Sequence, residues 1–172
     1  MKRLIFFAIL LFALQTNFAQ SIDTEASKIT FEISNMGLNT VKGSFGGMNG
    51  MVEFDANNLD NSKFDVCINA ESVDTDNRKR DDHLRKEDFF YVESHPTICF
   101  QSNSITKTSE GYITTGTLSM RGISKEVSIP FTFSDNTFNG TLSLKRKDYK
   151  VGPSGGFMVG KTVDLKIICV LK

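Results

Sequence analysis

Apolar and polar residues alternate with a period of two along most of the chain after residue 20. Ile29, Phe31 and Ile33, for example, are separated by Thr30 and Glu32. Such a strand has one apolar and one polar face, which is typical of an antiparallel sheet that is covered on one side only. The pattern predicts strands at 28–35, 40–55, 63–73, 97–105, 111–120, 123–133, 137–147 and 161–171.

Short segments rich in Asp, Asn, Ser and Gly separate these runs and are typical of turns. The run 40–55 is the longest, and its glycines are of the kind that marks bends and bulges. Counted as one bent strand, it gives eight strands, whereas a hairpin at Asn49-Gly50 would give nine. Many short, regularly spaced strands predict an all-β sandwich or barrel, and we expect eight strands.

A strongly charged segment, residues 74–90, interrupts the alternation between the third and fourth strands. Thr75 or Asp76 can cap a short helix there. Its alternating acidic and basic residues fit either a catalytic cluster or a solvated helical face, and the solvated face is the commoner case. Phe89 and Phe90 are expected to pin the segment onto the sheet.

The first 20 residues have the pattern of a secretory signal peptide. Lys2 and Arg3 precede an apolar run, residues 4–14, that is much shorter than the roughly 20 residues needed to span a bilayer. We expect cleavage near Ala19-Gln20, with an uncleaved N-terminal anchor as the alternative. The prediction is an exported protein, periplasmic or secreted, with residues 21–172 as one domain and no membrane span after cleavage.

Composition narrows the possible partners. The chain has 172 residues, and its 20 basic and 20 acidic residues cancel, so nothing favours a nucleic-acid partner. It has 15 Phe and no Trp. Many of these rings have to be buried, either against one another or around a bound molecule.

The three cysteines, Cys67, Cys99 and Cys169, cannot all pair within one chain. Each lies in an apolar, β-branched run, where a free cysteine commonly acts as a small buried apolar residue. A Cys67–Cys99 disulfide between neighbouring strands is the alternative. The spacings do not fit a zinc site, and we expect no metal and no cofactor.

Candidate catalytic groups are few. His83 and His95 are the only histidines, and no Ser or Cys nucleophile stands at a motif spacing. We therefore expect no catalytic residue. An enzyme using His83 with Asp81 or Asp88 is the alternative, and a metal site from His83, His95 and Asp88 has weak support.

Several stretches, in order and spacing, carry a family resemblance. They are Ser72–Thr75, Arg80–Leu84, Asp88–Phe90, His95–Phe100, Gly116–Val127 and Arg146–Tyr149. Together they resemble the YceI-like family of lipid- or polyisoprenoid-binding proteins, over essentially all of residues 21–171. The resemblance implies an extended eight-stranded antiparallel barrel similar to lipocalins, with an elongated pore for a long apolar chain. It also implies export to the periplasm and a possible homodimer.

The apolar faces of the strands would line such a pore, although alternation by itself fits a filled core equally well. The resemblance favours the pore. The predicted lining is Phe31, Ile33, Phe45, Phe54, Phe64, Val66, Ile68, Ile98, Phe100, Val127, Ile129, Phe131, Phe133, Phe138, Leu142, Leu144, Val163, Leu165 and Ile167. Further contacts near the ends are predicted from Met36, Met48, Met51, Met120 and Met158.

One charged residue falls on the same face. Arg146 is in register with Leu142 and Leu144, and a buried arginine needs a partner. That partner is either an inward carboxylate or a ligand headgroup.

The sequence thus predicts a non-catalytic protein that binds and carries or stores a hydrophobic small molecule of isoprenoid, fatty-acid or fatty-amide type. The alternative is a ligand-free envelope protein that acts through protein–protein interaction and has a tightly packed interior.

Overall fold

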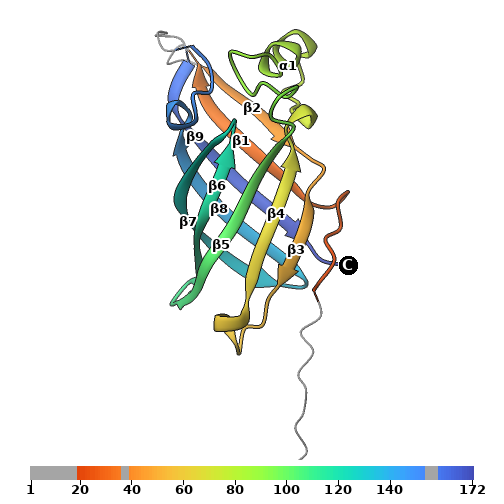
Figure 1. The fold of residues 1–172 in the computed structure, drawn as a ribbon, viewed down its shortest axis with the longest axis vertical. Coiled ribbons are helices and arrows are strands. Elements are labelled where there is room, and N and C mark those ends of the chain that lie inside the picture. The colour runs from red at the N-terminus through yellow and green to blue at the C-terminus, as the bar shows by residue number, and fades with distance from the viewer. Residues whose placement is uncertain (1–18, 36–38, 154–158) are drawn as a thin grey trace, which may run out of the picture.

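The computed structural model describes residues 19–35, 39–153 and 159–172. They form one curled, nine-stranded antiparallel sheet, shown in Figure 1. The strands are β1 (Lys28–Asn35), β2 (Asn39–Phe45), β3 (Asn49–Glu53), β4 (Lys63–Asn69), β5 (Thr97–Thr108), β6 (Gly111–Met120), β7 (Ile123–Ser134), β8 (Thr137–Lys145) and β9 (Val159–Val170). The helices are α1 (Arg78–Leu84) and the short 3-10 turns η1 (Leu59–Asn61), η2 (Ala70–Ser72) and η3 (Arg146–Tyr149). The predicted all-β, antiparallel, lipocalin-like architecture is confirmed.

The strand order is β2-β1-β9-β8-β7-β6-β5-β4-β3, so β1 pairs with the last strand of the chain. Short segments cover the two edges. The β2 edge exchanges two backbone hydrogen bonds with Asp74, and Gln20 donates its N–H to the Val52 carbonyl on β3 at 2.8 Å. Covered edges are protected from pairing with another chain. Gln20, which the sequence assigned to the signal segment, therefore contacts the sheet, while residues 1–18 lie outside the described part.

The expected count of eight strands is wrong, because the run 40–55 forms two strands with different partners. β2 pairs with β1, and β3 pairs with β4, where Asn49 lies opposite Cys67. Gly47, at φ +68°, allows the chain to turn between them, since this backbone conformation suits glycine. Both strands face the same interior, so the alternation of apolar residues continues across the break and conceals it.

The pairing of β7 with β8 is unusually short. It runs only from Phe131 opposite Gly140 to Ser134 opposite Thr137, although both strands extend further. The ladder stops beside Pro130, which has no N–H to donate. The part of β7 from Ile123 to Pro130 is therefore paired with β6 alone.

Aromatic rings fill the end of the sheet near the β5–β6 and β7–β8 turns. We call Phe54, Phe64, Tyr112, Phe131, Phe133 and Phe138 the aromatic cluster. The Phe54 ring centroid lies 5.0 to 6.1 Å from those of the other five rings. Edge-to-face packing of this kind stabilises beyond the area that it buries, and it closes this end of the interior.

The charged segment forms α1 at the opposite end of the sheet (Figure 1). Its N-cap is Asn77, whose side chain accepts a hydrogen bond from the Arg80 N–H at 3.1 Å. The expected caps, Thr75 and Asp76, have other roles: Thr75 is buried and donates to the Asp81 carboxylate, and Asp76 has a φ of 57°.

Hydrogen bonds and a ring contact hold this segment onto the strands. The Gly152 N–H donates to the Asp88 carbonyl at 2.8 Å, and the Arg121 guanidinium donates to the Glu87 and Lys150 carbonyls. The Phe90 ring packs edge-on against Phe45, 5.2 Å between centroids, as the sequence predicted. The α1 segment and the η3 turn therefore cover this end together.

Candidate functional site

Two adjoining cavities lie inside the curled sheet. The first, which we call the deep cavity, has a volume of about 150 Å³. Its walls are Ile29, Phe45, Met48, Val52, Phe64, Val66, Ile68, Ile98, Phe100, Thr114, Leu118, Met120, Ile129, Phe131, Phe138, Gly140, Leu142, Leu144, Leu165, Ile167 and Cys169. None of these side chains is charged, and the Thr114 hydroxyl donates to the Ser104 carbonyl at 3.2 Å. Apolar cavities of about this size stay dry and accept small apolar molecules.

The second, which we call the helix-end cavity, has a volume of about 210 Å³. Its walls are Phe31, Ile33, Asn35, Val41, Phe45, Arg80, His83, Leu84, Phe89, Phe90, Met120, Leu144, Arg146, Val151, Val159, Val163 and Leu165. Phe45, Met120, Leu144 and Leu165 line both cavities. The two cavities therefore share a wall, and we call the pair, which lies between the aromatic cluster and α1, the elongated space.

All but three of the residues predicted to line a pore lie on these walls. The exceptions are Phe54 and Phe133, which belong to the aromatic cluster, and Val127, which packs against the core. The interior is thus partly filled and partly hollow, which alternation had left open. Of the predicted methionines, Met48 and Met120 line the walls, whereas Met36 and Met158 lie outside the described residues. Met51 is 47% exposed, because its neighbour Val52 takes the inward position.

The sequence missed wall residues on β6 and on α1. On β6, Thr114, Gly116 and Leu118 face inward, and Thr114 and Leu118 are wall residues. Because this face includes a polar residue and a glycine, its sequence lacks the apolar alternation that predicts an inward face. Arg80 was assigned to a solvated helical face, because the position of α1 over the cavity depends on contacts distant in sequence. Cys169 is also a wall residue, and its inward placement follows the alternation of β9.

Arg146 is the buried charge of the site, with 6% of its surface exposed. Its Nε donates to the Gly160 carbonyl at 2.8 Å, Nη1 to the Val151 carbonyl at 2.7 Å, and Nη2 to the Val159 carbonyl at 3.4 Å. Burial lowers the pKa of this guanidinium. Among the described residues no carboxylate forms an ion pair with it, so the inward carboxylate that the sequence offered as one partner is not found there.

His83 lies where the helix-end cavity meets the surface. Its side chain is 58% exposed, and its Nε2 is 2.9 Å from the Asp88 carboxylate. Asp81, the other candidate partner, is buried and bound to Thr75 instead. Within the described ranges, no group of three His, Cys, Asp or Glu side chains has metal-site geometry.

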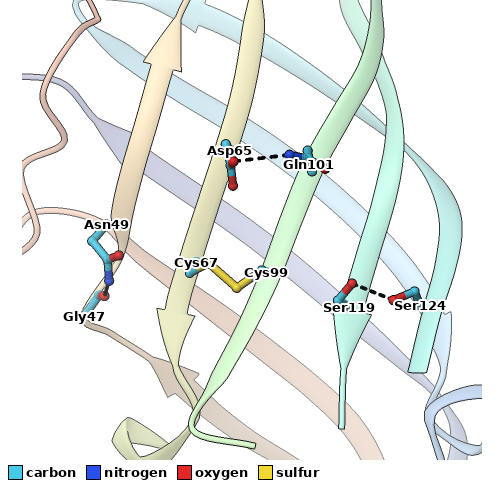
Figure 2. Close-up of a disulfide and its surroundings, with 8 residues drawn as sticks. All are labelled: Gly47, Asn49, Asp65, Cys67, Cys99, Gln101, Ser119 and Ser124. Atoms are coloured by element: carbon cyan, nitrogen blue, oxygen red, sulfur yellow. Dashed lines mark hydrogen bonds between the residues drawn. A yellow bond between two sulfur atoms is a disulfide. The ribbon is translucent and has the colours of Figure 1, made fainter. Parts of the chain in front are cut away.

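The cysteines divide into a pair and a single thiol. Cys67 and Cys99 are opposite each other on β4 and β5 and form a disulfide with a Cα–Cα distance of 4.1 Å (Figure 2). This decides between the two alternatives that the sequence left open. Cys169 is free and buried, and burial raises the pKa of its thiol to about 11.

The YceI-like domain family matches the chain over residues 20–171. The chain belongs to the YceI-like family. Its relatives include the UPF0312 protein of Ectopseudomonas mendocina, which is 34% identical over 164 residues, covering 89% of this chain and 85% of the relative. The UPF0312 protein of Photorhabdus laumondii is 32% identical over 154 residues, or 90% and 76% of the two chains.

Solved structures share the fold of this YceI-like protein. Burkholderia cenocepacia BcnA superimposes with a TM-score of 0.80 at 25% identity, over 88% of this chain and 99% of BcnA. A polyisoprenoid binding domain from Saccharophagus degradans superimposes with a TM-score of 0.67 at 15% identity, over 90% and 98% of the chains. In the described part of this protein, the helices are too short to cross a bilayer.

Proposed function

We propose that this protein binds one long apolar or amphiphilic molecule inside its curled sheet and carries or stores it unchanged. Isoprenoids, fatty acids and fatty amides have the required chemistry. The observation that carries the proposal is the elongated space of two adjoining cavities, one with uncharged and almost entirely apolar described walls and one whose walls are mostly apolar. The Saccharophagus degradans domain of the same fold, which is described as polyisoprenoid binding, supports it.

The energetics suit a chain-like ligand. Burying a methylene group contributes roughly 0.8 kcal/mol, so about ten methylenes would contribute roughly 8 kcal/mol before the cost of ordering the chain. An acyl or prenyl chain needs apolar area more than polar partners, and the walls of the deep cavity supply it.

We also propose that the protein is exported. The Cys67–Cys99 disulfide supports this, because disulfides persist mainly in oxidising compartments. Cleavage between Ala19 and Gln20 would leave the bond from Gln20 to Val52 in place. The signal-like residues 1–18 lie outside the described part.

Native mass spectrometry of the protein purified from its own cell envelope tests the binding function. We expect one discrete apolar adduct that is lost on solvent extraction, and a higher melting temperature when a prenyl or acyl lipid is added back. A clean ligand-free mass, with no stabilisation by either lipid class, would contradict the proposal and favour action through a protein partner.

A further inference from the structure

The elongated space has a cationic end and an uncharged end. The guanidinium groups of Arg80 and Arg146 belong to residues that line the helix-end cavity, together with His83, and none of its described wall residues is Asp or Glu. None of the described residues on the walls of the deep cavity is charged. His83 lines this cavity and its side chain is 58% exposed, so the cationic end lies next to the molecular surface. An amphiphile would therefore place its polar group in the helix-end cavity, near the surface, and its apolar part in the deep cavity.

Arg146 carries a buried charge, and its hydrogen-bond partners in the described part of the chain are all neutral. Its three hydrogen-bond acceptors are backbone carbonyls. A guanidinium remains protonated in proteins, and a buried charge is unfavourable unless an opposite charge compensates it. Since no acidic residue pairs with Arg146 among the described residues, an anion that enters the cavity would be its counter-charge.

Arg80 is held in a fixed orientation on the same cavity. Its Nε donates to the Thr75 hydroxyl and its Nη2 to the Thr75 carbonyl, both at 2.7 Å. In the described part of the chain, its Nη1 forms no hydrogen bond. A guanidinium oriented in advance loses little freedom when it binds a carboxylate or phosphate.

Gly152 leaves room for this arrangement. Its φ is +76°, and a Cβ atom there would lie 2.8 Å from Arg146 Nη1 and 2.9 Å from Phe89 Cε1. A side chain at this position would displace the guanidinium or the ring. The loop thus approaches Arg146 so closely that only glycine keeps both in place.

We propose that the helix-end cavity binds an anionic headgroup, a carboxylate or a phosphate, through Arg146 and Arg80, while the apolar tail extends into the deep cavity. This inference rests on the proposed function and adds the ligand's charge and orientation. Charge-assisted hydrogen bonds to the two guanidinium groups would select the anion over a neutral headgroup on the same tail.

The test is calorimetric titration of the delipidated full chain with matched pairs of probes: hexadecanoate against hexadecanol, and farnesyl phosphate against farnesol. We expect the anion of at least one pair to bind about ten- to a hundredfold more tightly, the range of charge-assisted hydrogen bonds. A preference within one pair only identifies carboxylate or phosphate as the headgroup. Arg146→Gln and Arg80→Gln should each reduce the preference.

Arg78→Gln is the matched control, because Arg78 is an exposed residue of α1 that does not line the helix-end cavity. It should keep the preference. If Arg146→Gln fails to fold, the Arg80→Gln variant provides the test, since among the described residues the Arg80 side chain bonds Thr75 alone. Equal binding of anion and alcohol in both pairs, or an unchanged preference in Arg80→Gln, would overturn the headgroup inference alone. Failure of all four probes to bind would overturn the proposed function as well.

Discussion

Replacing Leu144 with tryptophan should separate the two cavities. Leu144 lies on the wall that they share, so an indole ring at this position would obstruct the passage from the helix-end cavity into the deep cavity. We expect Leu144→Trp to bind short chains nearly as well as the wild type and long chains far more weakly.

The size of the effect follows from the deep cavity. Its volume is about 150 Å³. A cavity of that size holds a benzene molecule, so about six carbons of a chain would be excluded. At roughly 0.8 kcal/mol each, these carbons contribute about 5 kcal/mol, or more than a thousandfold in the dissociation constant.

The assay is calorimetric titration with a series of saturated fatty acids of increasing length. In the wild type each added methylene should tighten binding roughly fourfold until the space is filled. In Leu144→Trp the affinity should stop rising about six carbons earlier.

Lys145→Trp is the control, because Lys145 is the next residue of β8 and is exposed on the opposite face. It should follow the wild-type series. Overpacking costs about 1–3 kcal/mol of folding stability, so urea denaturation should accompany the titrations. If a folded Leu144→Trp variant shows the wild-type dependence on chain length, the ligand tail does not occupy the deep cavity.

Three further predictions concern stability. Replacing Cys67 and Cys99 with serine removes a crosslink between residues separated by 32 positions. Loop-closure entropy predicts that the free energy of unfolding falls by about 3–4 kcal/mol, measured by urea denaturation without reductant. An unchanged urea midpoint would refute this prediction. The pKa of Cys169 in the folded protein, about 11, lies above that of a thiol in the unfolded chain. The neutral thiol therefore contributes to the free energy of unfolding in full below the unfolded pKa, and this contribution is lost as the pH rises toward 11. Cys169→Ala should therefore lose less stability than the wild type between pH 8 and pH 10.5, and parallel curves would argue against this. Asn77→Ala removes the N-cap of α1 and should lower the stability of the helix by about 1 kcal/mol. The measurement is amide hydrogen exchange, which should become faster in the first turn of α1. Unchanged exchange there would show that the cap does not stabilise the helix.

The alternation of apolar residues is a local property, and it located most of the strands closely. β6 and β7 begin at the predicted residues, and Arg146 is buried on the inner side, where its register with Leu142 and Leu144 placed it. Strand position and side-chain direction depend on neighbouring residues in the chain, so one sequence suffices to predict them.

Other features required the tertiary structure, because they depend on residues far apart in sequence. The disulfide forms because the register of β4 with β5 sets Cys67 opposite Cys99, and alternation carries no information on register. The sequence predicts that Arg80 lies on a solvated helical face, but the position of α1 places it on the wall of the helix-end cavity.

By itself, then, the sequence determined the class of fold, the inward faces and, through its motifs, the family. Only the tertiary structure decided that the interior is partly hollow and that its buried arginine has no acidic partner among the described residues. The physical reason is that hollowness is a small difference between the volume that the curled sheet encloses and the volume of the side chains that fill it. Period-two alternation is the same for a filled and for a hollow interior.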